Sequence, residues 1–177
     1  MKKKTLALVL ALTLLVAGVV GGTLAWLTDQ TAEVKNTFTV GDINIGLTET
    51  TADYKMVPGN TIAKDPTVTV KANSEACWLF VKVTESTDLK DFITYAIAEG
   101  WTALPGVDGV YYREVPASAA DQTFSVLKGD AVTVNSDVTK EMLTAKDFAN
   151  PTLTFKAYAV QKDNVASASD AWAKVNP

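Results

Sequence analysis

The sequence has no histidine in 177 residues and only one cysteine, Cys77. Without histidine, the usual serine and cysteine triads and imidazole-based zinc sites are excluded. One thiol also excludes a scaffold built on intrachain disulfides. Cys77 lies in a strongly apolar stretch, so we interpret it as a small buried side chain rather than a reactive or intermolecular thiol.

The chain also lacks the sequence motifs of common enzymes. There is no HExxH, GxSxG, Walker loop or GxGxxG pattern. We therefore expect no enzyme activity, no cofactor and no metal site. The net charge is −4 even with three lysines at the N-terminus, which gives no electrostatic reason to bind nucleic acid or an anionic membrane surface. What is present is 47% apolar and 20% charged residues, the composition of a folded domain.

The N-terminus has the order of a secretory signal peptide. Met1–Lys4 is basic, Leu6–Val20 is apolar, and small residues follow up to Ala25. This order predicts cleavage between Ala25 and Trp26. The alternative is an uncleaved membrane anchor, and both alternatives deliver the rest of the chain to the outside. We expect residues 1–25 to be the signal and 26–177 to form one domain, which contacts the membrane only through its N-terminal segment before cleavage.

The rest of the sequence predicts β-structure throughout. Alternating apolar residues, or a run apolar on both faces at Ala76–Thr84, predict short strands bounded by Pro, Gly and Asn turns. The expected strands are Ala32–Val40, Ile43–Leu47, Thr67–Ala72, Ala76–Thr84, Ile93–Ala98, Val110–Val115, Thr123–Leu127, Ala131–Val134 and Pro151–Val160. Short helices are expected within Ser136–Lys146 and from a Ser169 cap through Lys174. Many short strands with turns between them indicate an all-β sandwich or jelly roll.

Several motifs have a chemical and a structural interpretation. Asp42 and Asn44 stand at alternate positions, as two calcium ligands do, but the rest of such a loop is missing and we interpret them as a turn. Asp137 and Glu141 are four residues apart, and we interpret them as solvated helix acids rather than a catalytic pair. Trp78 and Phe80 share a strand face, which we expect to pack against a second layer.

Five segments resemble the TasA/camelysin family of Gram-positive bacteria. They lie in the order in which that family has its motifs, and together they touch most of the chain. The segments are Gly21–Asp29, Asn36–Ile45, Val57–Asn60 with Lys64–Pro66, Phe155–Gln161, and Ala168–Trp172. Leu27 departs from the family pattern, which often has an aromatic residue there.

The resemblance implies a jelly-roll β-sandwich that a SipW-type signal peptidase processes. It implies secretion to the cell surface or biofilm matrix, and assembly into fibres in which the N-terminal segment of one subunit completes the sheet of the next. Expected partners are further copies of the chain, other matrix proteins and the signal peptidase. Some family members are classed as metallopeptidases, but a chain without histidine fits that chemistry poorly.

The residues themselves are compatible with such assembly. An uncovered edge strand offers unpaired N–H and C=O groups, and an extended segment can add to it. The expected donor is Trp26–Lys35. In this segment Trp26, Ala32 and Val34 share a face, and Leu27 and Thr28 follow Trp26 at its beginning. A head-to-tail contact of this kind does not close, so it produces a filament. The alternative is that this segment pairs within its own subunit as the first strand.

Two other functions remain open from the sequence. One is a secreted peptidase that uses only carboxylates, such as Asp137 and Glu141. The other is a module that binds a glycan or protein through Trp101, Tyr111 and Tyr112, which stand near turn sequences.

Overall fold

The computed structural model describes residues 42–50, 55–144 and 150–175. All of these belong to one compact unit, Val40–Pro177. The predicted signal cleavage at Ala25 and Trp26 lies outside the described residues. So do the predicted donor residues Leu27, Thr28, Ala32 and Val34, and the predicted strand Ala32–Val40.

Short strands make up most of the described chain, joined by a few helical turns. The strands are β1 (Ile45–Thr48), β2 (Thr61–Ala63), β3 (Thr67–Val70), β4 (Cys77–Glu85), β5 (Ile93–Thr94), β6 (Thr102–Ala103), β7 (Val110–Val115), β8 (Gln122–Ser125), β9 (Ala131–Val134) and β10 (Leu153–Gln161). The helices are α2 (Leu89–Phe92), the 3-10 turn η1 (Lys128–Asp130), α3 (Lys140–Thr144) and α4 (Ala168–Val175).

The strands form three sheets in which every pairing is antiparallel. Their orders are β1-β3-β8, β10-β4-β7-β6 and β2-β9-β5. The predicted all-β class is therefore confirmed.

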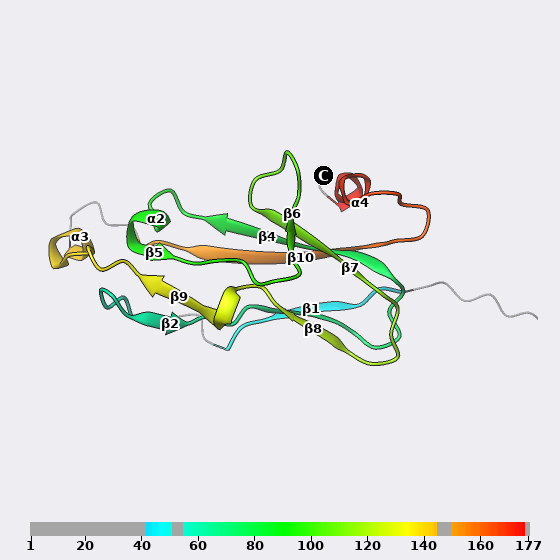
Figure 1. Cartoon of the computed structure of the whole chain (residues 1–177), viewed down its shortest axis with the longest axis horizontal. Helices are drawn as coiled ribbons and strands as arrows, with labels where there is room; N and C mark the ends of the chain where they lie inside the picture. The colour runs from blue at the N-terminus through cyan, green and yellow to red at the C-terminus, as the bar shows by residue number, and fades with distance from the viewer. Residues whose placement is uncertain (1–41, 51–54, 145–149, 176–177) are drawn as a thin grey trace, which may run out of the picture. The chain divides into compact units, whose positions relative to one another are not determined.

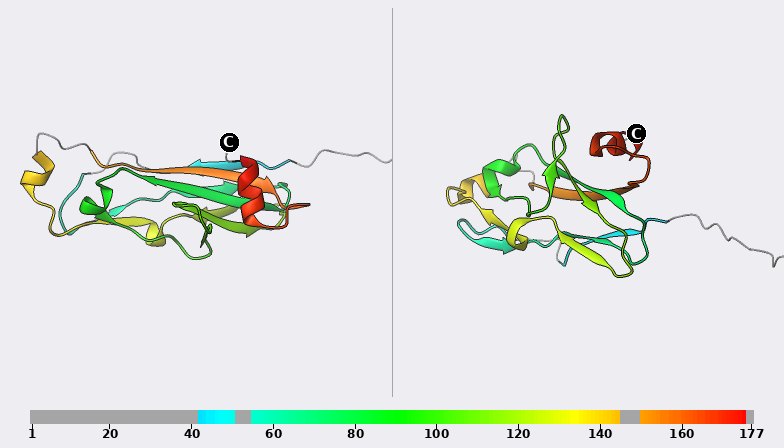
Figure 2. Two further views of the ribbon diagram at one scale, coloured as in Figure 1. Left: turned by 90° about the horizontal axis from the view of Figure 1, so that it is seen from above. Right: turned by 45° about the vertical axis from the view of Figure 1, so that its right-hand side comes forward.

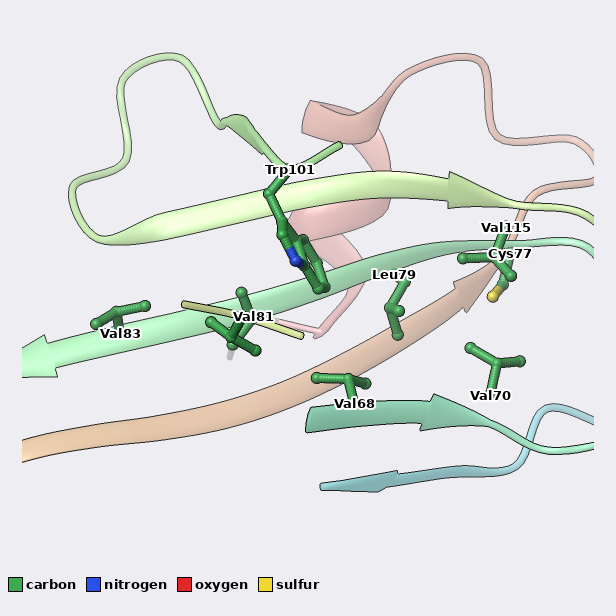
Figure 3. Packing of buried hydrophobic residues seen from close by; sticks show 9 residues of the cluster. Val68, Val70, Cys77, Leu79, Val81, Val83, Trp101 and Val115 are labelled. Carbon is green, nitrogen blue, oxygen red and sulfur yellow. The ribbon is translucent and has the colours of Figure 1, made fainter. Parts of the chain in front are cut away.

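Figure 1 shows these sheets as two facing layers. The four-stranded sheet makes one layer, and the other two sheets follow one another along the opposite layer. The main core lies between the layers, where Val68 and Val70 of β3 meet Leu79 and Val81 of β4 (Figure 3).

The strand β4 is central, as its continuous apolar sequence predicts. It pairs with β10 on one side and β7 on the other, and its residues Cys77–Val81 are all buried. Alternate side chains of a strand point to opposite faces. The cluster between the layers contains Leu79 and Val81, and a second cluster on the outer face contains Trp78 and Phe80.

The helix α4 covers this outer face (Figure 2). Its Trp172 packs 5.3 Å from the Phe80 ring and 5.2 Å, edge-on, from the Tyr158 ring. The prediction that Trp78 and Phe80 pack against a second layer is confirmed. The helix begins two residues earlier than predicted, at Ala168, and its cap is Ser167, not Ser169: Ser167 Oγ accepts the Asp170 N–H at 3.1 Å.

Other predicted boundaries also need correction. The strand predicted at Ile93–Ala98 ends at Thr94, because the following segment turns away to bond the β8–β9 connection: Ala98 N–H donates to the Val126 carbonyl at 2.9 Å. A short helix does lie within the predicted range Ser136–Lys146, at Lys140–Thr144, and the Met142 N–H donates to Thr139 Oγ1 at its start. The sequence analysis missed β2, β6 and α2, which are only two to four residues long.

Within residues 42–50, 55–144 and 150–175, no helix is both long enough and apolar enough to cross a membrane.

Candidate functional site

The strand β10 forms one border of the four-stranded sheet, and its other side pairs with no strand among the described residues. Hydrogen bonds extend its ladder with β4 at both ends. The Ser86 N–H donates to the Thr152 carbonyl at 2.9 Å, and the Lys162 N–H donates to the Ala76 carbonyl at 2.8 Å. In an antiparallel pair, the residues between such hydrogen-bonded positions direct their backbone groups away from the partner strand. The odd-numbered residues of β10, from Leu153 to Ala159, therefore direct their N–H and C=O groups outward.

The strand β1 borders the opposite layer on the same side of the molecule. It pairs only with β3 among the described strands, and it lies against β10. The Lys71 N–H donates to the Asn44 carbonyl at 2.8 Å, so by the same alternation Ile45 and Leu47 direct their backbone groups outward. We call these outward sides of β1 and β10 the open edge.

A groove of about 720 Å³ lies along the open edge, between the start of β10 and the end of β1. Its walls are mostly apolar and come from both layers, including Leu153 and Phe155 of β10, Ile62 of β2 and Val132 of β9. Leu47 also lines it and is 37% exposed, one of the two large apolar residues that are exposed in the described part of the chain. An apolar groove beside unpaired strand edges has the chemistry to receive an extended segment.

An ion pair lies in the wall of this groove. Lys64 Nζ contacts Glu49 Oε1 at 2.6 Å and lies 5.5 Å from the centre of the Phe155 ring. Its side chain is only 9% exposed, against 25% for Glu49. This pair therefore ties the segment after β1 to the connection between β2 and β3.

The same connection holds the end of β1 through a carboxylate. Asp65 accepts the Thr50 N–H at 2.9 Å and also accepts the Thr50 hydroxyl. The two hydrogen bonds from Thr50, side chain first, lower the pKa of the Asp65 carboxyl.

The opposite side of the sandwich is closed. Here residues 96–101 run beside β8: Lys128 N–H donates to the Ala96 carbonyl, and the Trp101 indole N–H donates to the Ser125 carbonyl, both at 2.9 Å. Trp101 is 9% exposed, and its ring points into the core toward Val81 (Figure 3). We call this side the closed edge, because residues 96–101 bond Ser125 and the connection that follows β8.

The residues of the proposed glycan-binding or protein-binding module are not gathered on one surface. Trp101 is buried in the closed edge. Tyr111 packs against the core between the layers, whereas Tyr112 packs against Trp78 and Phe80 on the outer face. Neighbouring residues of one strand face opposite ways, which explains the separation.

The remaining sequence candidates lie apart from the groove. Asp137 and Glu141 are exposed around the start of α3. Asp42 accepts the Glu75 N–H through its backbone carbonyl, and Asn44 N–H donates to Ser74 Oγ, so both residues bond the segment that follows β3. No group of three or more metal-ligating side chains occurs in the part of the chain that the structure describes. Cys77 is fully buried, and burial raises the pKa of its thiol to about 11.

The sequence analysis did not identify the groove residues. Leu47 looked like an ordinary inward residue of an alternating strand, and Lys64 was noted only as part of a motif. Neither has a local signal for its role, because the groove exists only where two distant segments face each other.

Comparison of the chain with protein-family models, with curated proteins and with solved structures finds no match.

Proposed function

We propose that this chain is a secreted structural protein of the cell surface or biofilm matrix of a Gram-positive bacterium, and that it assembles into fibres by strand addition. The observation that carries the proposal is the open edge with its apolar groove. The order of the TasA/camelysin-like motifs supports the same function from the sequence.

In this proposal the signal peptide is removed after Ala25 and leaves Trp26–Lys35 as the donor segment. The donor lies in the groove of the next subunit and pairs with the outward backbone groups of β10. Its apolar residues Trp26, Ala32 and Val34 share one face, which matches a groove lined by Leu153, Phe155 and Ile62. The strands then belong to a jelly-roll sandwich that a neighbouring chain completes.

The groove explains why such a contact would propagate. Donor and acceptor are different parts of the chain, so each added subunit presents a new acceptor and the contact does not close on itself. Strand addition also covers backbone groups that would otherwise remain available for unspecific pairing.

The first test uses protein secreted by an expressing Gram-positive host. N-terminal sequencing is expected to give Trp26 as the first residue, and electron microscopy is expected to show fibres. A variant without residues 26–35 is expected to remain monomeric with unchanged circular dichroism. Secreted protein that stays monomeric at high concentration with Trp26 at its N-terminus would contradict the proposal.

A second test addresses the groove with a matched pair of substitutions. Leu47 and Val57 are the large apolar residues that are most exposed among those described, at 37% and 49%. Leu47 lines the groove and Val57 does not. Leu47→Asp is therefore expected to prevent fibre formation, because it places a charge where an apolar segment would dock, whereas Val57→Asp leaves assembly intact. Equal assembly of the two variants would argue against this groove as the acceptor.

A further inference from the structure

Arg113 is the single arginine of the chain, and it lies in an unusual position on the closed edge. It is opposite Leu79 in the β7–β4 ladder, so its side chain leaves β7 on the face that meets the other layer. The centre of the guanidinium is 3.9 Å from the Phe124 ring centre and 5.4 Å from the Trp101 ring centre. Two aromatic rings from different layers thus hold the cation in place.

The guanidinium has no acidic partner within the described chain. The ion pairs there all involve lysines, Lys64, Lys71, Lys90 and Lys162. Arg113 Nε is buried and makes no hydrogen bond to any described residue, whereas the residue as a whole is only partly buried. Burial lowers the pKa of Arg113, but an arginine remains charged at neutral pH.

The backbone leaves room for this arrangement at Gly100. A Cβ atom on Gly100 would lie 3.0 Å from Nη2 and 3.4 Å from Nη1 of Arg113, and Gly100 has a φ of +85°. Any other residue at position 100 would crowd the guanidinium and strain the backbone. The Gly100 backbone therefore lies close to both Nη groups and leaves the guanidinium the room it occupies.

We propose that Arg113 is a carboxylate-binding site that takes an acidic side chain of another polypeptide. Nη1 and Nη2 donate two parallel hydrogen bonds to the two carboxylate oxygens, the geometry in which guanidinium and carboxylate pair best. The Phe124 ring lies 3.9 Å from the guanidinium centre, and a planar two-oxygen group matches the edge that carries Nη1 and Nη2. The net charge of −4 repels a polyanion such as an acidic polysaccharide, whereas one carboxylate within a protein surface meets little repulsion.

This inference does not depend on the proposed fibre. The site is on the closed edge, and the groove is on the open edge. Loss of carboxylate binding with normal fibres, or normal carboxylate binding without fibres, would separate the two proposals.

The single arginine allows a direct test, because a ¹⁵N spectrum of the purified protein contains one arginine Nε–Hε signal. Acetate is the probe, with sodium chloride at the same ionic strength as the reference. Acetate is expected to shift this signal with half-saturation at roughly 10–100 mM, as for one bidentate pair in water. Equal and non-saturating drift with acetate and chloride would overturn the proposal and leave Arg113 as a stacking residue only.

Further comparisons test the geometry and the source of the carboxylate. The Trp101 indole N–H signal, assigned with Trp101→Phe, should respond to acetate in the native protein and not in Arg113→Lys, because lysine keeps the charge but lacks the planar fork. A glutamate-containing peptide should bind at least as well as polygalacturonate, and tighter binding of the polysaccharide would contradict a protein partner.

Glu99 is the nearest acid in sequence to Gly100, and Glu99→Gln should leave the Nε–Hε signal unchanged. A large shift in that variant would show that Glu99 occupies the site and would overturn the proposal.

Discussion

The two long sides of the sandwich differ in how the outward backbone groups of their border strands are bonded. On the closed edge, residues 96–101 bond Ser125 and the connection that follows β8, and Trp101 and Arg113 lie between the layers. On the open edge, β1 and β10 have no further strand among those described, and an apolar groove lies between them. Among the described residues, the two sides therefore differ in how far the outward backbone groups of their border strands are bonded, and exposed groups of this kind are available to a further strand.

The largest expected effect is on the closed edge at Trp101. Trp101→Ala removes a buried ring that joins the two layers, and we expect the free energy of unfolding to fall by about 3–5 kcal/mol. Urea unfolding followed by circular dichroism measures this loss. Trp101→Phe keeps most of the ring and loses the hydrogen bond to Ser125, so its cost should be about 1 kcal/mol. If the alanine variant costs no more than the phenylalanine variant, Trp101 does not close this edge.

The turn before β7 should show the next largest effect. Gly109 has a φ of +70°, and a Cβ there would lie 2.4 Å from the Val83 carbonyl oxygen. Gly109→Ala should therefore cost about 3 kcal/mol, from backbone strain and from displacement of β4. Gly106, in the neighbouring turn of the same connection, has a φ of +75° but nothing within 4 Å. Gly106→Ala should cost only about 1 kcal/mol in the same urea assay, and equal costs would contradict the close approach.

A smaller effect is expected for the ion pair on the open edge. Glu49→Gln removes the carboxylate beside the more buried Lys64 ammonium, and we expect a cost of about 2 kcal/mol. Lys64→Met leaves the more exposed Glu49 carboxylate, which water can solvate, so its cost should be about 1 kcal/mol. Thermal unfolding of the two variants measures the order, and the reverse order would show that Glu49 is the more strongly buried partner.

The smallest effect compares one carboxylate from each side. Hydrogen bonds from Thr50 lower the pKa of Asp65 below 3.8, and the Ala72 N–H, then Lys71, lower the pKa of Asp121. A lowered folded-state pKa contributes stability that is fully present above the unfolded value and is lost as the pH falls through the folded value. Both contributions should therefore disappear only below about pH 4. Asp65→Asn and Asp121→Asn should each flatten the acid side of the urea-midpoint profile, and an unchanged profile would contradict these assignments.

Local patterns predicted the fold class well, because alternation and turns are properties of neighbouring residues. The run Cys77–Val81 predicted a central strand, since only a strand covered on both faces tolerates apolar side chains at every position. The interval Ile93–Ala98 shows the limit: Tyr95 and Ile97 do contact the core, as alternation predicts, but the backbone there pairs with a connection and not with a ladder. Strands as short as β6 carry too few residues to show a period at all.

The sequence by itself determined that the described chain is built of antiparallel strands, that Cys77 is buried and that Trp78 and Phe80 face a covered side. Those properties follow from side-chain hydrophobicity and from the two-residue period of a strand. Only the tertiary structure decided which edge is closed, that Trp101 lies inside it, and that Leu47 and Lys64 border a groove. Such features depend on residues far apart in the chain meeting across two layers, and no local pattern records that meeting.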